Sequence, residues 1–466
     1  MKLLHFLSFL FLALSFSCQT HKPIQEPEKT LSLPEKFSQS PIHMPLESNW
    51  WEAFDHPLLK QIVEDGLKEN TSLKIAWYRL EQSQKSLKSK EASLWPKLDL
   101  VFNAKRQRDN LLTSLNPNKD IHYSTALALT PKLSYEIDLM GRVSSSKQSA
   151  YHQMKASEDY VLATQLMVSG QLAKMWLNKL IQQKLYHLTK EQIDTNQSIL
   201  ELVELKYQQS DLPISELLQQ QAIIEAKQSA LPLIQNAYST FHQQLVFLSG
   251  LSNFEEEGIS HFDTALPTLP DLPGLYNPKD LLHLRPDVHL QYQMLLAADQ
   301  QLAHAISLQF PSSVISLDYQ FSAQNLENLF ETNVASLAGQ IASPIFSAGK
   351  IQAHIEVKEA ALKESFQNFK QSFFQSLQEI EHSLQNEKNL LEHHKILQQQ
   401  QRHIQKAFEL SKSNYINGIS SYLMVLTALN SLQETEVKLI KSEGNILLNR
   451  MDLYLALGQN NNKSII

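Results

Sequence analysis

The sequence predicts a mainly α-helical protein with a membrane β-barrel portion, in which one structural unit is used twice. Glycine is scarce, at 11 of 466 residues, and Gln, Leu, Ser and Lys recur, a composition that favours long helices. Residues 142–207 and 350–415 contain no proline, and about 65 residues of helix extend on the order of 100 Å. Two other stretches carry an apolar residue at every second position, which is typical of amphipathic strands.

The duplication is visible as a constant offset of 208 residues between matching positions. Tyr207 matches Tyr415 at this offset, and Gly250 matches Gly458. The same offset relates two ladders of apolar residues with seven-residue spacing: Leu217, Ile224, Leu231, Tyr238 and Leu245, and Val425, Leu432, Leu439, Ile446 and Leu453. Strict seven-residue spacing predicts coiled-coil packing of the helices that carry the ladders.

The N-terminus has the features of a secretory signal. A basic start and a short apolar run predict a signal peptide over residues 1–17. Cys18 is the only cysteine and ends an imperfect lipobox, so we expect it to be lipidated; ordinary signal cleavage with an incidental thiol is the alternative. Residues 18–47 are rich in Pro, Glu, Ser and Lys, which predicts an extended, lipid-anchored tether.

The first structural repeat is expected over residues 48–251. Asp55 is placed to cap a helix with Pro57 in its first turn, and this helix should end before Trp95-Pro96. Alternation over residues 98–105 and 123–139 predicts a long hairpin with one apolar and one polar face. Pro131 cannot donate to a strand ladder, so we expect it at a bulge or at the sheet margin.

A proline-rich linker over residues 252–278 separates the repeats, and the second repeat is expected over 279–458. Its first helix should run from about residue 279 through Arg285-Pro286-Asp287 to residue 308. Two further strands, the second long helix from Gly349 to about Tyr415, and the second ladder follow. Residues 459–466 form a C-terminal tail.

Four amphipathic strands are too few to close a membrane barrel, which takes about eight or more. Lipid does not tolerate the unpaired edges of an open sheet. The chain is therefore expected to oligomerise and to pool its strands with those of other copies.

A set of short motifs in this order resembles the TolC family of outer-membrane efflux proteins, in particular the lipoprotein, NodT-like branch of RND-type efflux outer-membrane factors. The motifs are Trp50-Trp51-x-x-Phe54-x-x-Pro57-Leu58, Ser134-Tyr135-Glu136-Ile137-Asp138-Leu139-x-Gly141-Arg142, Leu284-Arg285-Pro286-Asp287, Phe310-Pro311, Pro344-Ile345-Phe346-x-x-Gly349-Lys350, Tyr415-x-x-Gly418 and Leu455-Ala456-Leu457-Gly458. The resemblance implies a homotrimer with a twelve-stranded barrel in the outer membrane and a helical barrel across the periplasm. It also implies two partners, a periplasmic adaptor (membrane fusion protein) and an inner-membrane pump of the RND type.

These features favour a passive exit duct for small molecules such as drugs, lipid-anchored in the outer membrane of a Gram-negative bacterium. No catalytic or metal motif is present, so we expect neither enzyme activity nor a cofactor. The net charge of −7 gives no support for nucleic-acid binding. Two alternatives stay open: the outer-membrane duct of a type I protein secretion system, and a poreless periplasmic coiled-coil scaffold.

By the resemblance, the breaks after the two long helices form the periplasmic aperture. The aperture residues are Ser215, Glu216, Met424 and Thr427. In a trimer, three copies of Glu216 would form a negative ring that favours cations. The alternative for Glu216 is a solvated glutamate, which is favourable near a helix N-terminus.

The same breaks are the expected docking tips for the adaptor. They comprise Tyr207, Ser210, Asp211, Leu212, Tyr415, Asn417, Gly418 and Ile419. The alternative for the two tyrosines is that each packs against its own neighbouring helix.

Overall fold

The computed structural model describes residues 21–22, 37, 49–109, 122–209, 213–250, 265–275 and 277–458. Several predicted features lie outside the described residues: the signal peptide, Cys18, most of the tether, the first-turn residues Ser210, Asp211 and Leu212, part of the linker, and the C-terminal tail. The chain forms two compact units. One contains residues 79–158 and 290–370 together with 21–22, and the other contains the described residues of 32–78, 159–289 and 371–466.

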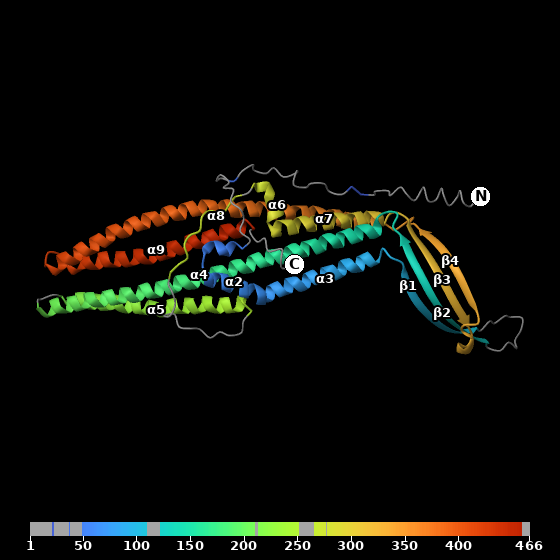
Figure 1. Ribbon diagram of the computed structural model, residues 1–466, viewed down its shortest axis with the longest axis horizontal. Coiled ribbons are helices and arrows are strands. Elements are labelled where there is room, and N and C mark those ends of the chain that lie inside the picture. The colour runs from blue at the N-terminus through green and yellow to red at the C-terminus, as the bar shows by residue number, and fades with distance from the viewer. Residues whose placement is uncertain are drawn as a thin grey trace. The chain divides into compact units, whose positions relative to one another are not determined.

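The order of elements repeats along the chain (Figure 1). The first copy contains η2 (Trp50–Phe54), α2 (Pro57–Glu69), α3 (Thr71–Ala92), β1 (Lys97–Asp109), β2 (His122–Ile137), α4 (Arg142–Gln209) and α5 (Ile214–Leu248). The second contains η3 (Pro278–Asp280), α6 (Leu281–Leu284), α7 (Pro286–Ser307), β3 (Ser312–Ala323), η4 (Leu326–Asn328), β4 (Asn333–Ala342), α8 (Lys350–Ile416) and α9 (Tyr422–Ala456).

Backbone geometry confirms the duplication. Helices α4 and α8 have 68 and 67 residues, and α5 and α9 have 35 each. Gly141 and Gly349 open the long helices with φ of 71° and 80°. Gly250 and Gly458 follow α5 and α9 with φ of 68° and 71°. Both pairs therefore have the left-handed conformation that glycine adopts without strain.

The four strands form one antiparallel sheet in the order β1-β2-β3-β4. One face exposes large apolar side chains in this chain, among them Leu98, Leu100, Phe102, Leu317 and Leu337. The opposite face carries the polar residues, and a row of Asp99, Lys132, Asp318 and Ser336 crosses all four strands in direct register. The predicted division into an apolar and a polar face is confirmed.

The prediction for Pro131 is wrong. Pro131 lies inside β2, which has β1 on one side and β3 on the other, and it pairs with Leu100 of β1. The β2–β3 register is the same on both sides of it, so no residue is inserted. Instead, the β2–β3 pairing is interrupted at residues 130–131 and resumes at Lys132. The missing donor is therefore accommodated by a local gap in the pairing.

Three helix predictions are also wrong. The single helix expected to end before Trp95 is divided at Asn70 into α2 and α3. Asp55 does not cap α2; it ends η2 in a left-handed conformation with φ of 43°, and His56 precedes Pro57 at the helix start. The helix expected from residue 279 to 308 is broken at Arg285, which is extended (φ −92°, ψ 117°). The residue before a proline avoids the helical region, and Pro286 imposes this break.

An aromatic cluster forms the centre of the second unit. Trp50, Trp51 and Phe54 of η2 are buried, and the Trp50 ring stacks with that of Tyr454 of α9, with 6.3 Å between the ring centroids. The Trp50 indole donates to Ser169 Oγ of α4 over 3.1 Å. These contacts fix the N-terminal part of the unit to α4 and α9. Among the described residues, no helix combines the length and apolar character needed to cross a membrane.

Candidate functional site

The C-terminal ends of α4 and α8 lie close together in the second unit (left in Figure 1). Lys206, in the last turn of α4, joins them. Its ammonium lies 4.3 Å from the centroid of the Tyr415 ring and also donates a hydrogen bond to the Tyr415 carbonyl oxygen. A cation above an aromatic face is attracted by the ring quadrupole. The ends of the two long helices are therefore held to each other within one chain.

Tyr415 is buried within the tip, with 3% of its surface exposed. Its ring packs against Tyr422 at 6.0 Å between centroids. The Tyr415 hydroxyl and one carboxylate oxygen of Glu216 are both buried without a hydrogen-bond partner of ordinary geometry among the described residues. Burial raises the pKa of Tyr415 to about 12, and the nearby charge of Glu216 adds to this rise. The same two causes, burial first, raise the pKa of Tyr422.

A polar layer begins at Tyr422 and extends away from the tip. The Tyr422 hydroxyl donates to Gln220 Oε1 over 2.6 Å, and Gln220 Nε2 donates to the Asn196 carbonyl over 2.7 Å. Gln220 and Asn196 are fully buried, so this layer links α4, α5 and α9 without water-exposed groups. A satisfied buried polar layer favours one helix register, because a shifted register would leave these groups unpaired.

The second turn has the conformation that Gly418 makes possible. Its φ is +73°, and its N–H donates to the Tyr415 carbonyl over 3.1 Å. The N–H of Ile419 donates to the Asn414 carbonyl over 2.8 Å, which closes the end of α8. No atom lies within 4 Å of the position that a Cβ on Gly418 would take. The glycine is thus required by its backbone angle and not by crowding.

The structure separates the predicted site residues into exposed and buried groups. Exposed at the two turns are Tyr207, Ser215, Asn417, Gly418, Ile419, Met424 and Thr427. Glu216 is partly buried, and Tyr415 faces the interior. Sequence reasoning missed Lys206 and Tyr422. Tyr422 has Ile214 as its counterpart 208 residues earlier, so the duplication itself gave no sign of its hydrogen bond to Gln220.

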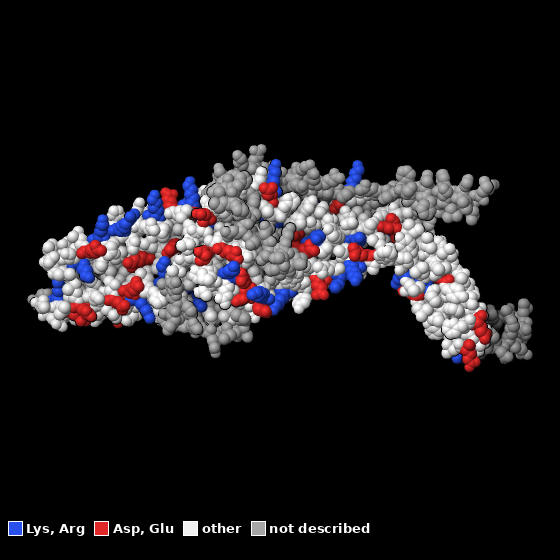
Figure 2. Space-filling model, in the orientation of Figure 1, with Lys and Arg blue, Asp and Glu red and all other residues white. Residues whose placement is uncertain are grey.

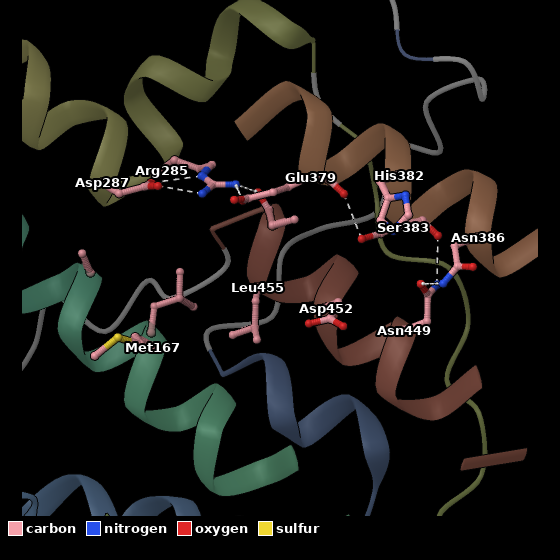
Figure 3. A pocket seen from close by; sticks show the side chains of 13 residues that line it. Met167, Arg285, Asp287, Glu379, His382, Ser383, Asn386, Asn449, Asp452 and Leu455 are labelled. Atoms are coloured by element: carbon pink, nitrogen blue, oxygen red, sulfur yellow. Dashed lines mark hydrogen bonds and ion pairs between the residues drawn. The ribbon is translucent and has the colours of Figure 1, made fainter. Parts of the chain in front are cut away.

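A second polar centre surrounds Arg285 in the same unit (Figure 3). Arg285 is buried and pairs with Asp287 at 2.6 Å and with Glu379 at 2.7 Å, and it donates to the Ala456 carbonyl over 2.9 Å. It lines a cavity of about 590 Å³ between α4, α8 and α9. These bonds tie the start of α7 to α8 and α9, which supports a structural role for the Arg285-Pro286-Asp287 motif.

Arg450 of α9 forms another buried ion pair, with Glu387 of α8, at 2.5 Å. The same guanidinium donates to the Pro270 carbonyl, so the pair also fixes the described part of the linker, residues 265–275. No group of three or more His, Cys, Asp or Glu suited to a metal ion occurs in the described ranges. Lysine and arginine alternate with acidic residues over the helical surface in Figure 2, and the visible part of the sheet is largely uncharged.

Comparisons with known proteins relate this geometry to membrane channels. The sequence model of a family described as "Outer membrane efflux protein" matches residues 62–251 and 277–459. Pyoverdine export outer membrane protein OpmQ of Pseudomonas putida is 25% identical over 421 residues, or 88% of each chain. Toluene efflux pump outer membrane protein TtgI of Pseudomonas putida is 24% identical over 410 residues, covering 87% of this chain and 86% of that protein. In fold, the CmeC outer membrane channel of Campylobacter jejuni matches with a TM-score of 0.84 at 21% identity, over 95% of each chain.

Proposed function

The chain belongs to the outer membrane efflux protein family, and on this premise we propose that it is the trimeric exit duct of a tripartite efflux system. The resemblance inferred from the sequence motifs is confirmed at the level of the family, whose members are outer-membrane efflux proteins. The observation that supports a trimer is the open sheet. Within the described ranges, strands β1 and β4 each have one unpaired edge, and the apolar face is exposed. In lipid, such edges pair with those of other copies, and three chains supply twelve strands.

In this proposal the two turns at the tip meet the periplasmic adaptor. Tyr207, Asn417 and Ile419 are exposed there, whereas Tyr415 supports the turn from inside. The remaining first-turn residues of the proposed docking surface are Ser210, Asp211 and Leu212. An inner-membrane pump of the RND type supplies the energy, and small molecules cross the duct passively.

The aperture is proposed at Ser215, Glu216, Met424 and Thr427, three of which are exposed in a single chain. Each chain contributes one Glu216, and the matching position of the second repeat is Met424. A trimer would therefore have three Glu216 side chains at the aperture, although its two repeats per chain supply six tips. Glu216→Gln should reduce the preference of the pore for cations, measured as a shift in reversal potential under a salt gradient. An unchanged reversal potential would show that Glu216 does not contribute to the ion preference of the aperture.

We place the chain in the outer membrane with a lipid on Cys18 and the helices in the periplasm. Mass spectrometry of the mature N-terminus tests the lipid directly. A diacylglyceryl thioether and fatty acyl group on Cys18 are expected, and a free thiol would show ordinary signal cleavage.

Docking is tested by photocrosslinking from the tip. A crosslinking amino acid at Ile419 should capture a periplasmic adaptor, whereas the same amino acid at the exposed Lys388, in the middle of α8, should not. Equal capture from both positions would refute docking at the tips.

The inner-membrane protein that copurifies with the captured complex distinguishes drug efflux from type I protein secretion. A scaffold without a pore would leave dye accumulation unchanged when the chain is deleted from its host.

A further inference from the structure

Asp299 lies on the buried face of α7, with 1% of its side chain exposed. Leu295 and Leu302, one turn before and one turn after it on the same face, are buried as well. A carboxylate in such a position is costly unless it is paired and hydrogen-bonded. The structure must therefore supply a partner.

The partner comes from the N-terminal segment. His21 Nε2 lies 2.7 Å from Asp299 Oδ1, although 278 residues separate the two. The His21 side chain is 16% exposed. The other carboxylate oxygen has only the Gln300 amide nitrogen at 3.5 Å, the limit of a hydrogen bond. Among the described residues, His21 is thus the one close partner of Asp299.

The position of this contact in the sequence suggests its role. His21 follows Cys18 by three residues, and three residues of fully extended chain span at most about 11 Å. On the other side, Asp299 lies eight residues before the end of α7, and β3 begins five residues later at Ser312. Eight helical residues extend about 12 Å. The contact therefore joins the start of the expected mature chain to the helix that leads into the sheet.

We infer that His21 and Asp299 form a clasp that holds the start of the mature chain against α7, so that the lipid anchor enters the membrane at a fixed place. This inference rests on the lipidation of Cys18 proposed above. The clasp converts the N-terminal segment from a free tether into an attached one. It also gives the buried Asp299 carboxylate the donor it needs.

A spin label placed beside His21 tests the clasp in the full-length protein. In the Lys22→Cys variant a lipidated Cys18 is blocked, so one nitroxide per chain should be incorporated; two per chain would show that Cys18 is free. The label should be immobilised in the otherwise unchanged protein. His21→Ala and Asp299→Asn should each increase the ratio of mobile to immobile label by about tenfold or more, the ratio expected for loss of a charge-assisted hydrogen bond.

His152→Ala is the matched control. His152 lies in the same unit and contacts Gln293 of α7 at 2.8 Å, without involving the N-terminal segment. It should leave the label immobilised. A label that is mobile without any substitution, or that stays immobilised in both His21→Ala and Asp299→Asn, overturns the clasp. Ion conductance should be the same in His21→Ala as in the unchanged protein, so failure of the clasp is distinguishable from failure of the channel proposal.

Discussion

Lys206 contacts Tyr415 twice, through the face of the ring at 4.3 Å and through the backbone carbonyl. The two residues lie on different copies of the repeat, 209 positions apart. One lysine therefore connects the end of the first long helix to the end of the second. The buried ring of Tyr415 makes this connection part of the tip's interior.

Lys206→Met should loosen the second turn while preserving the fold. The variant loses a cation–π contact and a hydrogen bond to a carbonyl, together about 1–2 kcal/mol of local stability. Hydrogen exchange of the amides at residues 417–419 should accelerate by about tenfold. Lys190→Met is the control, because Lys190 lies 4.8 Å from the Tyr186 ring on the same helix and joins no second element in the part of the chain that the structure describes. Equal acceleration at these amides in both variants would contradict the link.

The phenol of Tyr415 should make the tip sensitive to alkaline pH. Its pKa is raised from 10.0 to about 12, so the neutral phenol contributes its full stability below pH 10 and loses it as the pH rises through 12. Tyr415→Phe has no such group and loses the interaction of the hydroxyl with the nearby Glu216 carboxylate, which should cost about 1–3 kcal/mol at neutral pH. The stability advantage of the unchanged protein over the variant should decline between pH 10 and 12. A difference that stays constant through this window would show that Tyr415 is not buried.

Sequence periodicity predicted the long helices, the two ladders and the faces of the sheet. Apolar residues that become buried recur at the helical spacing in helices and at every second position in strands. Val425 and Leu453 are buried members of a seven-residue ladder, as expected. The breaks at Asn70 and Arg285 are local exceptions within such patterns. Asn70 ends α2 and donates to the Leu248 carbonyl over 2.6 Å, a partner that no local pattern reveals.

The ends of the long helices could be predicted in position, but their side-chain contacts could not. The repeated turns marked Tyr207 and Tyr415 as equivalent, yet one is exposed and the other buried. Their difference depends on Lys206 and Tyr422, which reach Tyr415 from separate helices. Pairing of side chains from distant parts of a chain leaves no periodic signal in one sequence.

Gly418 should be sensitive to substitution because of its φ of +73°. Gly418→Ala meets no neighbouring atom, so its cost is the left-handed conformation alone, about 1–2 kcal/mol. Gly418→Pro should cost more, because proline fixes φ near −65° and removes the N–H that bonds to Tyr415. Chemical unfolding measures both, and adaptor coupling should fail in the proline variant while trimers persist. Gly339→Ala is the control for the alanine variant, since Gly339 has equal space and no positive φ; an equal cost at both glycines would exclude backbone strain.

The pair between Arg450 and Glu387 should be essential for stability. Glu387→Gln leaves the buried Arg450 charge without its carboxylate, which typically costs about 3–5 kcal/mol. The described linker should also become more accessible to protease, because Arg450 holds the Pro270 carbonyl. Glu443→Gln disrupts a more exposed pair with Lys184 and should cost about 1 kcal/mol or less. Similar losses in the two variants, measured by chemical unfolding, would contradict this assignment.

Planar-bilayer recording shows whether this chain forms a pore through a membrane, as proposed here. Purified protein should produce discrete ion-conducting steps, and Lys206→Met should increase the time spent open, because it loosens the turns proposed to surround the aperture. The absence of conductance from both proteins, after their insertion into the bilayer has been verified, would contradict the account.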